Sequence, residues 1–327
     1  MSTDAAAEHP GGLPSAPRFA NPFTAGRLRA LGDSIPPTWM VLVGIVSVQA
    51  GAGVAKNLFA VLPPSAVVWL RLLTSAVLLL VLARPALRGR TRADWMVVVG
   101  FGAALALMNF SIYQAIARIP MGIAVTIEFL GPLAVAIAGS RRKTDVVWVA
   151  LAAAGVVLLG RDDGSGTVTL AGVLFALLAA VAWAGYILLS AATGRRFSGT
   201  SGLAIASVVG VVLVAPAGIA EGGTALLDPR LLLFGLVVGL LSSVVPYTLE
   251  MQALRRMPPR VFGILMSLEP AAAALIGLAL LGEMLTVWQW AAVLCVVAAS
   301  AGATRSQQKR ERRARPAEDR QDADGPE

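Results

Sequence analysis

The sequence is poor in the side chains that most enzymes and metal sites need. It has one cysteine, Cys295, and one histidine, His9, among 327 residues. A lone cysteine excludes an intramolecular disulfide and a thiolate metal cage, and a lone histidine excludes zinc sites and catalytic sets built on histidine. The sequence contains no P-loop and no GxGxxG motif after a strand, which argues against ATP-driven transport by this chain. We therefore expect no enzymatic activity, no metal and no cofactor.

Charge is also scarce, and this scarcity indicates a membrane protein. Charged residues make up 14 % of the chain, whereas soluble domains contain about 25 %. Apolar residues make up 57 % even before the 33 glycines are counted. Because apolar runs of spanning length recur along the chain, we expect an all-α integral membrane protein with ten transmembrane helices. The ten runs are 38–58, 64–83, 95–117, 120–139, 146–160, 169–192, 199–220, 231–254, 260–281 and 286–304.

Most basic residues fall on one side of these expected spans. With the N-terminus in the cytoplasm, 22 of the 27 lysines and arginines lie on the cytoplasmic side, four lie on the outer side, and Arg71 lies within the second span. This asymmetry follows the positive-inside rule and predicts that both termini are cytoplasmic. It also accounts for the net charge of +8, so nucleic acid is not needed as a partner.

A short internal repeat divides the expected membrane body into two halves. The stretch QAIARIP at 114–120 returns as QALRRMP at 252–258, a shift of 138 residues. A half with five spans is odd-numbered, so its second copy must enter the membrane from the opposite side. Such inverted repeats are typical of secondary transporters, which bind substrate near the midplane between the halves. The expected parts are a disordered cytoplasmic tail (1–37), two five-helix repeats (38–160 and 169–304) and a charged disordered cytoplasmic tail (305–327).

Two carboxylates are expected near the middle of the membrane. Glu128 lies eight residues after Pro120, about 12 Å along a helix, and Glu269 lies eleven residues after Pro258, about 16 Å along. Each stands within one turn of a proline that frees a backbone carbonyl and permits a kink. Burial disfavours the charged form of a carboxyl, so such a group can exchange a proton near neutral pH, as a proton carrier requires. The alternative is that each glutamate caps a freed backbone group and only holds helices together.

Further polar and aromatic residues are expected at membrane depth. For Arg71 the alternatives are a pair with Glu128, a bond to a substrate carboxylate, or extension outward to anchor the helix. Gln49 is followed by small residues that favour close helix packing, so this segment either packs or lines a path. Asn109 and Tyr113 are one turn apart and share a helix face, and Trp183 and Tyr186 either pack in the core or form a binding wall. Tyr247 and Glu250 flank the inner third of the eighth span, where Glu250 is close enough to the helix end to be partly hydrated. Glu283 is expected to be a solvated charge on an outer loop.

Several stretches of the sequence resemble one transporter family. They are SVQAGAGVAKNLF (47–59), PMGIAVTIEFLGPLAVA (120–136), SRR (140–142), VPYTLEMQALRRMP (245–258) and FGILMSLEPAAAA (262–274). With ten spans in two inverted halves, the chain resembles the drug/metabolite transporter superfamily with an EamA-type domain in each half, and within it the inner-membrane threonine/homoserine exporter branch. This resemblance implies proton-driven export of small neutral amino acids and related metabolites across the inner membrane. It points at Gln49, Glu128, Tyr247, Glu250 and Glu269.

The leading interpretation is a secondary exporter that works by alternating access between its two repeats. The alternatives are transport or exchange of another small polar metabolite, and a non-transporting membrane scaffold subunit. Paired carboxylates within the membrane argue against a scaffold, because a purely structural span has no need of them. The expected partners are a small-molecule substrate, the proton and membrane lipid, and a homodimer is retained as an alternative to a monomer.

Overall fold

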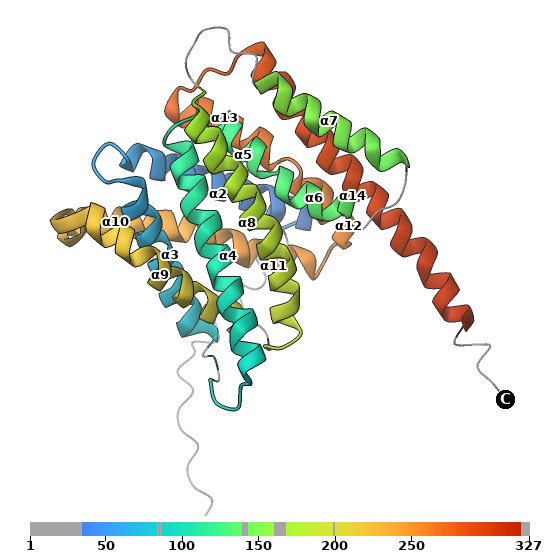
Figure 1. Cartoon of the computed structure of the whole chain (residues 1–327), viewed down its shortest axis with the longest axis horizontal. Helices are drawn as coiled ribbons and strands as arrows, with labels where there is room; N and C mark the ends of the chain where they lie inside the picture. The colour runs from blue at the N-terminus through green and yellow to red at the C-terminus, as the bar shows by residue number, and fades with distance from the viewer. Residues whose placement is uncertain are drawn as a thin grey trace, which may run out of the picture. The chain divides into compact units, whose positions relative to one another are not determined.

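The computed structural model describes residues 35–83, 85, 87–138, 143–159, 168–198 and 200–321. Residues 1–36 and 37–327 form separate units, and all the helices below belong to the second unit. The described residues are helical and contain no strand. Most of the expected N-terminal tail, the SRR stretch and the last six residues lie outside the described residues. The elements, most of them labelled in Figure 1, are α2 (Pro37–Leu58), α3 (Pro64–Ala83), α4 (Arg92–Ile116), α5 (Met121–Glu128), α6 (Leu130–Ala138), α7 (Lys143–Leu159), α8 (Leu170–Gly194), α9 (Ser201–Gly222), η1 (Gly223–Leu227), α10 (Pro229–Gly239), η2 (Leu240–Val244), α11 (Val245–Leu254), α12 (Pro259–Met266), α13 (Glu269–Leu281) and α14 (Val287–Gln321).

Nine helical segments within the described ranges are long and apolar enough to cross a membrane. They match nine of the ten expected runs, so the expectation of an all-helical, multi-pass membrane protein is confirmed. The remaining run forms α7, whose apolar stretch Val146–Leu159 is shorter than the other nine. Helix α7 lies along α14 (Figure 1). The tenth span and the cytoplasmic location of the termini stay predictions.

Two of the nine spans are each built from two α-helices with only one or two residues between them. Helix α5 ends at Glu128 and α6 begins at Leu130, whereas α12 ends at Met266 and α13 begins at Glu269. Prolines 132 and 270 follow the two breaks and remove backbone donors, so the chain leaves regular helix at these points. The interruption expected beside each glutamate is therefore present.

The two interrupted spans begin at matching positions in the repeat. Pro120 precedes α5 with φ −55° and ψ 140°, and Pro258 precedes α12 with φ −60° and ψ 136°. The preceding helices α4 and α11 end at Ile116 and Leu254, again 138 residues apart, and α5 and α12 are both eight residues long. The repeat seen in the sequence thus has a counterpart in the local backbone. The inverted relation of the two halves stays a prediction.

Helices from the two expected halves pack directly on one another. Helix α2 contacts α11 and α13, α3 contacts α9 and α10, and α4 contacts α8 and α9. Small residues permit the closest approaches, as is common between membrane helices. A Cβ atom added to Gly122 of α5 would lie 2.6 Å from the Cα atom of Ala274 in α13. This contact brings together the two interrupted spans that carry the glutamates.

Helix α14 continues beyond the expected end of the last span. It runs from Val287 to Gln321, whereas the sequence predicted a disordered tail from residue 305. The segment after Thr304 is rich in arginine, glutamate, glutamine and alanine, which all have high helix propensity. The helix therefore extends out of the apolar span into a charged segment.

Candidate functional site

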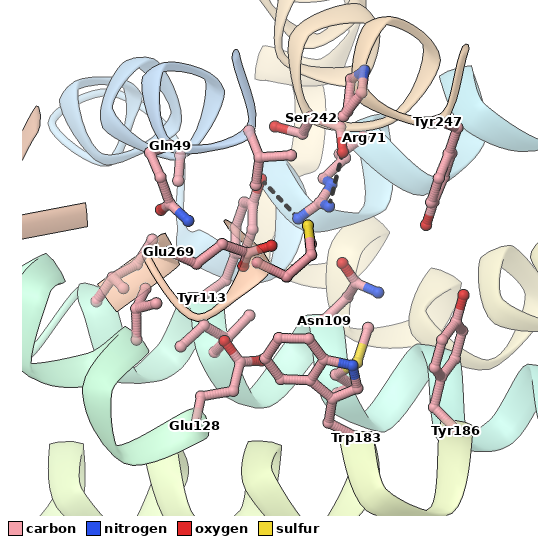
Figure 2. A pocket seen from close by; sticks show the side chains of 18 of the residues that line it. Gln49, Arg71, Asn109, Tyr113, Glu128, Trp183, Tyr186, Ser242, Tyr247 and Glu269 are labelled. Atoms are coloured by element: carbon pink, nitrogen blue, oxygen red, sulfur yellow. Dashed lines mark hydrogen bonds between the residues drawn. The ribbon is translucent and has the colours of Figure 1, made fainter. Parts of the chain in front are cut away.

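A polar cavity of about 280 Å³ lies where helices from both expected halves meet. All ten residues that the sequence singled out line it, and the structure therefore brings the complete predicted set together. They are Gln49, Arg71, Asn109, Tyr113, Glu128, Trp183, Tyr186, Tyr247, Glu250 and Glu269. Figure 2 labels all of them except Glu250. Small-molecule sites have volumes of about 300–1,000 Å³, so this cavity suits a small ligand. The role of each residue stays a prediction.

The helix interruptions place the two carboxylates at the cavity. Glu128 is the last residue of α5, and Glu269 is the first residue of α13. Each is 8 % exposed, and within the described ranges neither forms a hydrogen bond or an ion pair. The described contacts thus give no support to the alternative in which these glutamates cap backbone groups. Both side chains are directed toward the cavity in Figure 2.

Arg71 of α3 is the basic residue of the cavity. Its Nη1 donates to the Tyr113 hydroxyl at 3.5 Å, and its Nη2 donates to the backbone carbonyl of Ser242 at 3.3 Å, as marked by dashes in Figure 2. The guanidinium carbon lies 5.5 Å from the centre of the Tyr113 ring. Both hydrogen bonds are longer than the usual range, and both acceptors are neutral. Among the described residues Arg71 forms no ion pair, so the expected alternative of a direct pair with Glu128 is not observed.

A wide π-helical turn, η2 (Leu240–Val244), separates α10 from α11 beside this arginine. Pro246 explains the turn, because proline has no N–H and cannot bond to the carbonyl of Ser242 four residues before it. Arg71 donates to that carbonyl instead, and Ser47 of α2 donates to the neighbouring carbonyl at 2.7 Å. Wide turns of this kind are frequent at functional sites. The sequence pattern did not predict η2, although a proline inside an apolar run was an available signal.

Aromatic side chains form one wall of the cavity. Trp183 packs edge-on against Phe129 with ring centres 5.0 Å apart, and Tyr186 lies 5.0 Å from Phe101. The hydroxyl groups of Tyr186 and Tyr247 point toward one another in Figure 2. These residues pack in the core and line the cavity at the same time, so the two expected alternatives do not exclude each other.

The two amide side chains of the cavity are held differently. Asn109 donates from Nδ2 to the carbonyl of Leu105 in its own helix, at 2.8 Å. Gln49 of α2 is 2 % exposed and forms no hydrogen bond within the described part of the chain. The close-packed glycines that follow Gln49 show that this segment packs against other helices as well as lining the cavity.

The position of Glu283 differs from the prediction. Its side chain is 13 % exposed, accepts a hydrogen bond from Lys56 Nζ at 2.5 Å, and accepts another from the backbone N–H of Met121 at 2.7 Å. Lys56 also donates to the carbonyl of Ile119 at 3.0 Å. The prediction of a solvated loop charge is therefore wrong, because the fold brings α2, the start of α5 and the end of α13 together. We call these four residues the Lys56–Glu283 cluster.

Comparison with known proteins identifies the family. The model of the EamA-like transporter family matches residues 170–305. The threonine/homoserine exporter RhtA of Escherichia coli (strain K12) is 40 % identical over 275 residues, which cover 82 % of this chain and 92 % of that protein. The chain belongs to the EamA-like transporter family.

Other relatives of this EamA-like transporter cover different shares of the chain. The threonine/homoserine exporter RhtA of Salmonella typhimurium (strain SL1344) is 39 % identical over 276 residues, 82 % of this chain and 92 % of that protein. The uncharacterized transporter YwfM of Bacillus subtilis (strain 168) is 32 % identical over 152 residues, 46 % of this chain and 51 % of that protein. A solved crystal structure of a protein 21 % identical has a TM-score of 0.57 and covers 83 % of this chain and 98 % of its own, which supports the fold alone.

Family membership confirms the resemblance that the sequence motifs indicated. This EamA-like protein is a transporter rather than an enzyme, and it is a multi-pass protein of the inner membrane. A cavity with both signs of charge, set among membrane-spanning helices, agrees with transport of a small molecule.

Proposed function

We propose that this transporter exports small neutral amino acids, such as threonine and homoserine, across the inner membrane. One observation carries this proposal: the cavity presents an arginine and three glutamates, and the structure shows no ion pair among them in the described residues. An amino acid carries one carboxylate and one ammonium group, so it complements such a cavity. The relatives that match most of the chain have the name threonine/homoserine exporter, which supports the same substrate class.

Export is driven by inward proton flow, and Glu128 is the first candidate for the proton carrier. It is buried at a helix break, lines the cavity, and forms no hydrogen bond or ion pair with the described residues. A carboxyl in this position can take up a proton when the cavity is empty and lose it when a charged substrate binds. Glu269 lines the same cavity and is the second candidate.

Transport proceeds by alternating access between two inverted five-helix repeats with both termini in the cytoplasm. The matching helix ends at an offset of 138 residues support the repeat, and the asymmetry of basic residues supports the sidedness. Reporter fusions after Thr304 and within 162–167 test the ten-span topology. We expect a cytoplasmic signal from the first fusion and an external signal from the second, and an external signal at the C-terminus contradicts this topology.

The substrate is tested by export from intact cells. Cells that produce the transporter are loaded with dipeptides, and the release of each amino acid is compared with release from cells that lack it. We expect faster release of threonine and homoserine. Faster release of another polar metabolite alone would favour the transport alternative, and no change for any solute would favour the scaffold alternative.

A further inference from the structure

Arg71 is a cation at membrane depth whose side-chain hydrogen-bond partners, among the described residues, are neutral and distant. A guanidinium has five N–H donors in a planar fork. Two of these donate, at 3.3 and 3.5 Å, to a backbone carbonyl and a phenolic hydroxyl. A carboxylate can accept two parallel bonds from a guanidinium at about 2.7–2.9 Å, shorter than either of these contacts and with both partners charged. An anion that enters the cavity would therefore displace both partners.

The other ionic groups of the cavity do not supply that anion. Glu128, Glu250 and Glu269 line the same cavity, yet none of them forms an ion pair with Arg71 within the described ranges. A buried charge without a partner destabilises the protein, because it has lost its hydration. Such a charge within a membrane span indicates a functional site in which a ligand supplies the missing partner. The arginine and the glutamates are thus arranged to bind two opposite charges of one molecule.

We infer that Arg71 binds the carboxylate of the transported amino acid through a bidentate pair, and that the Tyr113 hydroxyl and Ser242 carbonyl hold its guanidinium in place until substrate arrives. The inference rests on the proposed function and deepens it, because it assigns the specificity for a carboxylate to one side chain. The Ser242 carbonyl is available for this task because Pro246 offers it no N–H. The glutamates then face the ammonium group of the same substrate.

The test compares ligands that differ in the carboxylate alone. Purified transporter in detergent is titrated with L-threonine and with L-threoninamide, which keeps the ammonium group and side chain but lacks the negative charge. Binding is followed by calorimetry and by the shift in melting temperature. We expect the wild-type protein to bind threonine at least about tenfold more tightly than threoninamide, as the loss of a charge-assisted bond implies.

Variants of Arg71 test whether this side chain causes the preference for threonine over threoninamide. Arg71→Gln should abolish the preference for threonine over threoninamide, and Arg71→Lys should weaken it, because lysine keeps the charge but lacks the planar fork. Arg118→Gln is the matched control, because Arg118 already donates to the carbonyl and side chain of Gln114 at 2.7 and 2.6 Å and lies outside the cavity lining.

The outcomes separate this inference from the proposed function. Equal affinity of the wild-type protein for threonine and threoninamide, or a preference that survives in Arg71→Gln, overturns the role of Arg71 and leaves the export of amino acids standing. A wild-type protein that binds no amino acid overturns both. A melting temperature of ligand-free Arg71→Gln equal to that of the wild type shows that its loss of binding is not a loss of folding. If that variant is unfolded, the Arg71→Lys protein decides, since an unchanged preference there contradicts the bidentate pair.

Discussion

The central cavity and the Lys56–Glu283 cluster both place charged groups where the two expected halves meet, but they use them differently. In the cluster, each oxygen of Glu283 has a donor, and Lys56 has two acceptors. In the cavity, Glu128 and Glu269 have no hydrogen-bond partner among the described residues, and Arg71 has only two long bonds to neutral acceptors. Basic and acidic side chains thus have close hydrogen-bond partners in the cluster and lack them in the cavity.

This difference separates a contact that holds the protein together from a site that awaits a ligand. A partly buried charge with close hydrogen-bond partners stabilises a fixed arrangement of helices. When one partner is removed, the remaining charge is buried without compensation for its lost hydration, which destabilises the protein. A buried charge without a partner contributes no such stability, and its presence indicates a function. We therefore expect substitutions in the cavity to change transport, and substitutions in the cluster to change stability first.

The largest effect is expected for Glu128→Gln. Glutamine keeps the size and much of the hydrogen-bonding capacity but cannot carry a proton, so export driven by a proton gradient should fall to the level of cells without the transporter. The measurement is amino-acid release from loaded cells, with membrane insertion checked by immunoblot. Exchange of labelled for unlabelled substrate, which moves no net protons, should persist.

Glu269→Gln is the matched control for this experiment. A milder loss than in Glu128→Gln would rank Glu128 as the carrier, whereas the reverse order would move that role to the second half. Normal export by Glu128→Gln, with an unchanged response to pH, would contradict the proposed coupling.

Lys56→Met should lower stability more than it lowers substrate affinity. The side chains of Lys56 and Glu283 are 22 % and 13 % exposed, so we expect a loss of about 2–3 kcal/mol in the free energy of unfolding, less than for a fully buried pair. Thermal unfolding in detergent measures this effect. The double variant with Glu283→Leu should lose less than the sum of the single variants, and strict additivity would show that the pair is not coupled.

Gly122→Ala tests the tight packing next to the cluster. The added Cβ atom would meet the backbone of Ala274 at 2.6 Å, so we expect a loss of about 1–3 kcal/mol in the free energy of unfolding. Gly194→Ala is the control, because a Cβ atom there meets nothing within 4 Å. An equal melting temperature for the two variants would show that α5 and α13 can move apart without cost.

The smallest effect is expected for Arg196→Gln. Arg196 pairs with Asp94 at 2.9 Å, but its side chain is 41 % exposed, and exposed pairs contribute little to stability because water screens them. Melting curves at low and high salt should differ little between this variant and the wild type. A loss as large as that of Lys56→Met would contradict the distinction between exposed and buried pairs that underlies these predictions.

The sequence predicted the local features of the molecule well. Apolar runs gave nine of the helical spans, and prolines 132 and 270 indicated where two of them are interrupted. The ten polar and aromatic residues that the sequence singled out at membrane depth all line one cavity.

Features that depend on contacts between distant segments were not predicted. Glu283 and Lys56 are 227 residues apart, and nothing in the local pattern around either residue indicates the other. The missing ion pair between Arg71 and Glu128 also depends on how α3 and α5 pack. The continuation of α14 to Gln321 was missed for another reason, since composition suggested disorder where helix propensity prevailed.

The wide turn at η2 sets the rotational phase of α11 relative to α10. One residue corresponds to about 100° of rotation in an α-helix, so an extra residue in one turn rotates everything that follows by about that angle. Gly235 and Gly239 of α10 pack against α3, and Tyr247 and Glu250 of α11, which follow the wide turn, line the cavity. Deletion of a single residue from 240–244 would rotate those two side chains by about 100° relative to α10 and turn them away from the cavity. Which side chains of α11 line the cavity thus depends on the number of residues in η2.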